Sequence, residues 1–150
     1  MKHSLMVTLL ISTLVGAPAY AQCEKGSSTL FSCSMQKSGK VVEVCDATDT
    51  IQYSFGKARK KPELALSVPR DEVTTSQWQG VGRYESYSVD IPNADTIYRV
   101  YWSHDRLNED QDNAVEAGVE VETNGKSVAN LLCKPASVVS NLQGVDLAEQ

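Results

Sequence analysis

Ser103, His104 and Asp105 bring together the three residue types of a hydrolytic triad. A working triad needs its side chains to converge on one point. These residues end a run of alternating aromatic and apolar residues, and neighbours on a β-strand point to opposite faces. His104 is also the only histidine after residue 3. The pattern indicates a strand end rather than a catalytic centre, and we expect no enzymatic activity and no cofactor.

The sequence also contains no pattern typical of a metal-binding site. The acidic segment HDRLNEDQDNAVE, residues 104–116, approaches a calcium loop in composition. A loop starting at Asn108 would need glycine where Asn113 stands and a carboxylate where Val119 stands. The four cysteines contain no C-x-x-C pair that would indicate zinc. We therefore expect a solvated acidic loop and no metal site.

The N-terminal segment has the pattern of a secretory signal peptide. Lys2 and His3 precede an apolar run at residues 5–15, and Ala19-Tyr20-Ala21 forms a cleavage site. We expect a signal peptide at 1–21 and a single exported domain at 22–150. Removing Lys2 with the signal peptide changes the formal charge from −5 to −6. This charge argues against nucleic acid or an anionic membrane surface as a partner.

An even number of cysteines in an exported chain predicts disulfides, here between Cys23, Cys33, Cys45 and Cys133. Strand parity favours one pairing. If Cys33 lies on the inner face of its strand, the following hairpin places Cys45 on the outer face. Cys33 then pairs with Cys133, and Cys23 with Cys45. A one-residue bulge would reverse the parity and allow Cys33 to pair with Cys45 instead.

Short alternating runs separated by turn residues recur along the rest of the chain. We expect eight strands, at residues 29–36, 41–45, 51–55, 64–67, 84–91, 96–102, 118–122 and 128–133. Asn124-Gly125 lies between two such runs and predicts a tight hairpin, because both central positions of that turn need positive φ. The predicted fold class is all-β, a small antiparallel β-barrel or sandwich.

The segment WQGVGRYESYS, residues 78–88, is rich in residue types that are enriched in protein interfaces. Gly80 and Gly82 allow a sharply protruding loop. Arg83 offers a planar set of donors suited to a carboxylate, and Tyr84 offers a large contact area. Tyr87 has two interpretations, because alternation along 84–91 also places it on the core face. A second cluster, GKARKKPE at 56–63, is most simply an exposed basic turn.

Two of these segments resemble the family of bacterial periplasmic lysozyme inhibitors. GVGRYESYS is similar to the Ser-Gly-x-x-Tyr loop of these proteins. YRVYWSHD, residues 98–105, is similar to the aromatic-Trp-Ser-Lys strand end that follows the loop in the C-type branch. Cys33 and Cys133 match that branch's disulfide positions. The signal peptide, size and four cysteines are most similar to the inhibitor of invertebrate-type lysozyme.

The resemblance implies a small β-barrel or sandwich that inhibits lysozyme in the periplasm by inserting a loop into the enzyme's cleft. The family's loop serine and strand-end lysine correspond here to Gly80 or Val81 and to His104. The partner would be a host lysozyme of the invertebrate type, and a homodimer is suggested. The implied site has a binding loop of Gly80, Val81, Gly82, Arg83, Tyr84 and Tyr87, and a second contact of Ser103 and His104.

The alternative is a periplasmic β-barrel module that binds a small ligand in its interior. This alternative depends on free space between the strands. An interior filled by the apolar side chains of the strands would leave no room for a ligand: Phe31, Met35, Val42, Val44 and Leu131.

Overall fold

The computed structural model describes residues 23–110 and 114–150. The predicted signal peptide, and Asn113 of the acidic segment, lie outside these ranges. Within them, no helix has the length and apolar content needed to cross a membrane. The ordered elements are nearly all strands, as the alternating sequence predicts.

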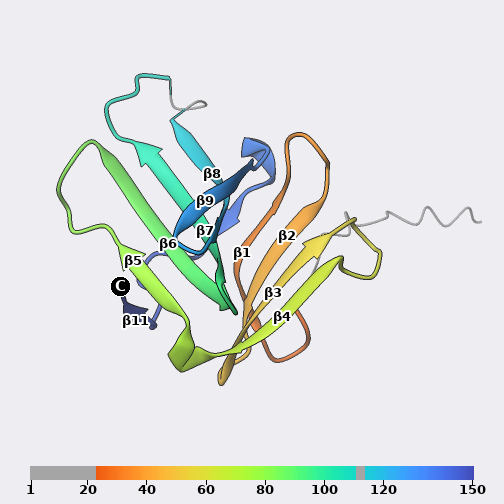
Figure 1. Cartoon of the computed structure of the whole chain (residues 1–150). Coiled ribbons are helices and arrows are strands. Elements are labelled where there is room, and N and C mark those ends of the chain that lie inside the picture. The colour runs from red at the N-terminus through yellow and green to blue at the C-terminus, as the bar shows by residue number, and fades with distance from the viewer. Residues whose placement is uncertain (1–22, 111–113) are drawn as a thin grey trace, which may run out of the picture.

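Two sheets face each other in an open sandwich and do not close into a barrel (Figure 1). The first sheet has the order β10-β1-β2-β3-β4, and the second has the order β11-β5-β6-β7-β8-β9. The strands of the first sheet are β1 (Ser28–Ser34), β2 (Val41–Asp46), β3 (Thr50–Gly56), β4 (Leu64–Pro69) and β10 (Val139–Ser140). Those of the second are β5 (Thr74–Gln77), β6 (Tyr84–Asn93), β7 (Thr96–Asp105), β8 (Val115–Thr123), β9 (Lys126–Leu132) and β11 (Ala148–Glu149).

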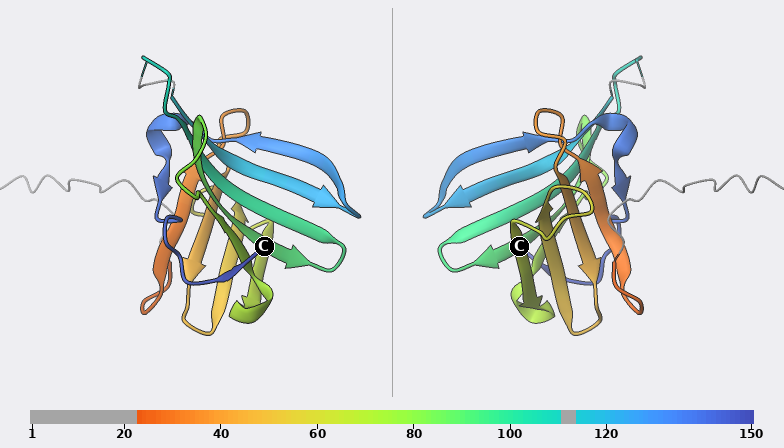
Figure 2. Two further views of the ribbon diagram at one scale, coloured as in Figure 1. Left: turned by 90° about the vertical axis from the view of Figure 1, so that its left-hand side faces the viewer. Right: turned by 90° about the vertical axis from the view of Figure 1, so that its right-hand side faces the viewer.

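All eight predicted strands are present. Three further strands, β5, β10 and β11, complete the sheets in the described part of the chain. The sheets are antiparallel except that β11 pairs in parallel with β5. Two short 3-10 turns, η1 (Arg70–Glu72) and η3 (Pro135–Ser137), connect elements that belong to different sheets. The hairpins β6–β7 and β8–β9 project past the first sheet (Figure 2).

The core lies between the facing sides of the two sheets. Phe31, Val42 and Val44 of the first sheet are fully buried, as are Val89 and Val100 of the second. Phe31 pairs with Val44 across β1 and β2, and Val89 pairs with Val100 across β6 and β7. Val42 lies two positions before Val44 on the same strand. The alternating apolar residues therefore form the core, as the sequence predicts, because residues two apart on a strand share a face.

Both predicted disulfides are present. Cys33 pairs with Cys133 at a Cα–Cα distance of 5.8 Å, and Cys23 pairs with Cys45 at 5.7 Å. Cys33 lies opposite Val42 in the β1–β2 register, which places both on the inner face. A bulge does occur in β1, but it precedes Phe31 and leaves the register of Cys33 unchanged.

The two hairpin turns that close the second sheet differ in how well the sequence predicted them. Asn124 and Gly125 both have positive φ, 51° and 72°, which confirms the tight turn between β8 and β9. The turn after β6 falls later than expected. The strand continues through Pro92, which pairs with Ile97, and the chain reverses at Ala94 with φ 54°.

Candidate functional site

Two segments far apart in sequence meet at one end of the second sheet. The Arg83 guanidinium donates two hydrogen bonds to the Asp105 carboxylate, Nε–Oδ1 2.8 Å and Nη2–Oδ2 2.6 Å. The Arg106 backbone N–H donates to the Arg83 carbonyl at 3.0 Å. Its guanidinium Nη1 donates to the Gly82 carbonyl at 3.2 Å. We call this surface the tip, defined as residues 78–84 with Asp105, Arg106 and Leu107. Both of its segments project from the same end of the sandwich (Figure 1).

The loop of the tip is held in shape by its own side chains. Gly80 and Gly82 have φ values of +83° and +100°, a region that other residues rarely adopt. The Trp78 indole Nε1–H donates to the Val81 carbonyl at 2.9 Å. The Arg106 guanidinium lies over the Trp78 ring, 4.8 Å from its centroid, in a cation–π contact. Trp78 therefore supports the loop from below and joins it to the residue that follows β7.

Large apolar side chains gather on the outside of the tip. Val81 is 81% exposed, Leu107 is 71% exposed and Tyr84 is 55% exposed. Within the described residues, six large apolar side chains are exposed, and these three are half of them. Exposed apolar residues scattered singly need no explanation, but a group of them beside an arginine resembles an interface centre.

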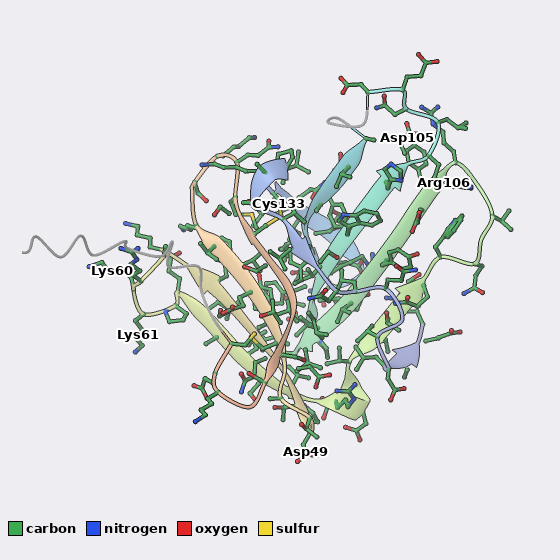
Figure 3. The ribbon with its side chains drawn as sticks, turned by 180° about the vertical axis from the view of Figure 1, so that it is seen from behind. Asp49, Lys60, Lys61, Asp105, Arg106 and Cys133 are labelled. Atoms are coloured by element: carbon green, nitrogen blue, oxygen red, sulfur yellow. A yellow bond between two sulfur atoms is a disulfide. The ribbon has the colours of Figure 1, made fainter. Side chains whose placement is uncertain are left out.

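The two arginines of the tip differ in their charge partners. Arg83 is engaged by Asp105, and its hydrogen bonds hold the pKa of the Asp105 carboxyl below its usual range. Arg106, in contrast, has no carboxylate within ion-pair distance among the described residues. Figure 3 places Asp105 and Arg106 next to each other at the outer end of the sheet. Arg106 is thus the cation of the tip that forms no ion pair with a described carboxylate, and its guanidinium contacts the Gly82 carbonyl and the Trp78 ring.

The predicted second contact is divided between the two faces of β7. Ser103 pairs with Ser86 across the β6–β7 ladder, and His104 pairs with Glu85. Residues two apart on a strand share a face, so Ser103 lies on the same face of β7 as Asp105, and His104 lies on the opposite face. The ring of His104 lies 6.1 Å from that of Trp102, on the inward face. His104 therefore does not share a face with Tyr84, which pairs with Asp105.

Tyr87 belongs to the inner face of β6 rather than to the loop. It is 6% exposed and its ring stacks near Trp102, with centroids 5.9 Å apart. Its hydroxyl donates to Glu85 Oε1 at 2.8 Å. Burial raises the pKa of Tyr87, and the hydrogen bond to Glu85 with that group's negative charge adds to the effect. The core interpretation of Tyr87 thus agrees with its position.

A cleft opens beside these aromatic residues, between the inner face of the second sheet and the segment that leads into β10. Its volume is about 710 Å³. Glu85, Tyr87, Trp102 and Val115 of the second sheet line one side. The other side is lined by residues that follow β9: Pro135, Ala136, Val138, Ser140 and Gln143. The cleft and the tip share the β6–β7 hairpin, since Tyr84 belongs to the tip and Glu85 to the cleft.

Elsewhere, one group of potential metal ligands lies within the described residues, Cys23, Glu43 and Cys45. The two sulfur atoms form the Cys23–Cys45 disulfide, so neither offers a thiolate to a metal. Glu43 is buried beside them, and burial raises the pKa of its carboxyl. The basic turn projects from the first sheet, with Lys60 and Lys61 well away from the tip (Figure 3).

Sequence reasoning missed two residues of the tip and the whole cleft. Arg106 and Leu107 directly follow the predicted strand end, and an exposed arginine–leucine pair after an aromatic strand was the available signal. The cleft depends on residues 135–143, which have no strong periodicity. No family model, no curated protein and no solved structure matches this chain.

Proposed function

We propose that this chain is an exported inhibitor of lysozyme that acts in the periplasm, with invertebrate-type lysozyme as its first candidate target. The observation that carries the proposal is the meeting of the Gly80–Tyr84 loop with the end of β7. The resemblance to the inhibitor family rests on these two segments. Arg83 and Asp105 lie 22 positions apart in the sequence and yet are joined by two hydrogen bonds.

The tip has the composition that such an interface needs. Lysozymes cleave their substrate with two carboxyl groups that flank the scissile bond. An inserted cation can bind the ionised carboxylate, and apolar side chains can exclude water and sugar around it. Arg106 supplies the cation, while Val81, Tyr84 and Leu107 supply exposed apolar area. The two disulfides are typical of proteins from an oxidising compartment.

The roles within the tip follow from the contacts of each residue. Arg83 binds Asp105 and positions the loop, together with the hydrogen bonds that Arg106 donates to the Arg83 and Gly82 carbonyls. Trp78 supports the loop through Val81 and Arg106. Direct contact with lysozyme falls to Arg106 and Tyr84. His104, on the inward face, contributes less than the resemblance implies.

The acidic charge of the chain fits a basic target. A formal charge of −6 after removal of residues 1–21 would speed encounter with a cationic lysozyme at low salt. The interface would bury on the order of 1,200–2,000 Å² in total, as is usual for enzyme–inhibitor complexes.

The roles are tested by comparing two variants that remove the same charge. Arg106→Ala removes this cation of the tip, and Lys60→Ala removes a cation from the remote basic turn. We expect Arg106→Ala to weaken inhibition of lysozyme by roughly tenfold or more, since a hydrogen bond to a charged group contributes about 1.5–3 kcal/mol. Lys60→Ala should change inhibition less than about twofold. Equal effects of the two variants on inhibition would show that the tip does not contact lysozyme through Arg106.

Tyr84→Ala extends the same test to the apolar part of the tip. Tyr84 is more than half exposed, so its loss should leave the melting temperature nearly unchanged. Inhibition should weaken, because tyrosines near an interface centre are frequent hot spots. A variant that inhibits as well as the parent protein would assign Tyr84 to the surface alone.

The interior-ligand alternative depends on free space between the two sheets. Phe31, Val42 and Val44 are fully buried, Met35 is 3% exposed, and Leu131 packs against the same cluster. The space between the sheets is thus filled by side chains at the positions that the alternative needed free. The cleft beside β6 and β7 lies at the edge of the sandwich rather than between the sheets, and it calls for a separate interpretation.

A further inference from the structure

The cleft beside β6 and β7 has one charged side chain in its lining. Glu85 is that residue, and the rest of the described lining is aromatic, apolar or neutral. One carboxylate oxygen of Glu85 accepts the Tyr87 hydroxyl at 2.8 Å. Among the described residues, no lysine, arginine or histidine nitrogen lies within ion-pair distance of Glu85. The cleft therefore carries a negative charge that no ion pair within residues 23–110 and 114–150 neutralises.

Two aromatic rings stand next to this carboxylate. Tyr87 and Trp102 face each other across the β6–β7 ladder, with an interplanar angle of 25°. The faces of such rings attract cations, and tryptophan does so most strongly. A carboxylate beside tyrosine and tryptophan is a combination that suits an ammonium or guanidinium group, and it repels an anion.

The opposite wall of the cleft is held in place independently of any ligand. Ser137 accepts a hydrogen bond from the Ser34 N–H at 3.0 Å, which ties the turn after Cys133 to β1. Further along, the Gln77 amide donates to the Leu142 carbonyl at 2.9 Å, and Leu142 is fully buried. The wall is therefore anchored at both of its ends, as is usual for binding sites that are largely formed before the ligand arrives.

We propose that this cleft is a binding site for an organic cation, with the Glu85 carboxylate as its counter-ion and the Tyr87 and Trp102 rings as its aromatic lining. The volume of about 710 Å³ is within the range of small-molecule sites. It admits a free small cation or the end of a basic side chain from a partner protein. The inference is independent of lysozyme inhibition, because none of the tip residues lines the cleft.

The test is a titration of the disulfide-bonded protein with defined probes, followed by calorimetry and by tryptophan fluorescence. The probes are choline, spermidine, a blocked arginine amide and the neutral analogue of choline that has carbon in place of nitrogen. Trp78→Phe leaves Trp102 as the single tryptophan, so that the fluorescence change reports on the cleft. We expect saturable binding of at least one cation, with a dissociation constant of about 1 mM or below.

Two variants with the same charge change give the matched comparison. Glu85→Gln keeps an oxygen for the Tyr87 hydroxyl but removes the charge, and it should weaken binding of the cation at least tenfold. Glu72→Gln removes a charge from the exposed turn η1 and should leave binding within about twofold. Thermal melting of each variant checks that the fold is kept.

The outcomes separate the sources of the ligand and can overturn the proposal. Binding of choline or spermidine indicates a free cation, and binding of the arginine amide alone indicates a basic side chain of a partner. The proposal fails if none of the cations binds. It also fails if the neutral analogue binds as tightly as choline, or if Glu85→Gln leaves the affinity for the cation unchanged.

Discussion

The two disulfides give a prediction whose size can be calculated from the fold. Cys33–Cys133 joins residues separated by 100 positions, and Cys23–Cys45 joins residues separated by 22. The first connects β1 of one sheet to the residue that follows β9 of the other, so it closes most of the chain. The second closes only the β1–β2 hairpin and the segment before it. The perturbation is the replacement of each pair by alanine.

The expected losses differ because loop-closure entropy grows with the logarithm of loop length. The chain-entropy relation gives about 4.7 kcal/mol for the longer loop and about 3.4 kcal/mol for the shorter one at 25 °C. Packing losses should not reverse this order, since Cys33 and Cys133 are both buried, whereas Cys23 is only half-buried beside the buried Cys45. Removing Cys33–Cys133 should therefore cost about 1.3 kcal/mol more than removing Cys23–Cys45. For a domain of this size, that difference corresponds to a melting temperature lower by about 5 °C.

The assay is urea unfolding of the two alanine variants, followed by far-ultraviolet circular dichroism, with the oxidised parent protein as reference. Equal slopes against urea would show that the variants unfold from comparable states. The reasoning would be refuted if the Cys23–Cys45 variant were the less stable of the two. That result would mean that the N-terminal segment, rather than closure of the long loop, carries the larger share of stability.

Two further predictions concern single residues of the sheets. A hydrogen bond from Arg70 lowers the pKa of the Asp46 carboxyl in the folded state. The pair therefore stabilises the fold fully at pH values above the unfolded-state pKa of about 3.9. This stabilisation is lost as the pH falls through the lower pKa of the folded state. Asp46→Asn should thus cost about 1 kcal/mol at pH 7 and nothing near pH 2, measured by urea unfolding across pH; a pH-independent cost would contradict the ion-pair origin. Gly118→Ala should destabilise the β8–β9 ladder by about 1–3 kcal/mol, because a Cβ there would lie 2.4 Å from the Leu131 carbonyl oxygen; an unchanged melting temperature would contradict this close approach.

Much of the fold could be predicted because its strands alternate strongly. The positions of β1 and β2 followed from Phe31, Cys33, Val42 and Val44, and the disulfide pairing followed from the same parity. β5 was missed because its sequence, TTSQ, has no apolar alternation. Its burial depends on a distant partner, since the Thr75 hydroxyl donates to the Ser88 carbonyl at 2.7 Å. Such a contact has no signature in the local sequence.

The site was predictable in part for the same reason. The loop residues and the end of β7 were both identified, and the β6–β7 hairpin makes them neighbours. The pairing of Arg83 with Asp105 could not be read from the sequence, because it depends on how far the loop folds back over the strand. Arg106 was overlooked since nothing distinguishes it from other exposed arginines until its contact with Trp78 is known.

The most direct measurement of the central claim is a titration of residues 22–150 into purified lysozymes while lysis of cell-wall substrate is followed. Chicken-type, goose-type and invertebrate-type enzymes serve as parallel targets. Lysozyme inhibition predicts that micromolar protein blocks at least one of them, with the invertebrate type blocked most strongly, and that Arg106→Ala relieves the block. Full activity of all three enzymes at micromolar protein would contradict the proposed function.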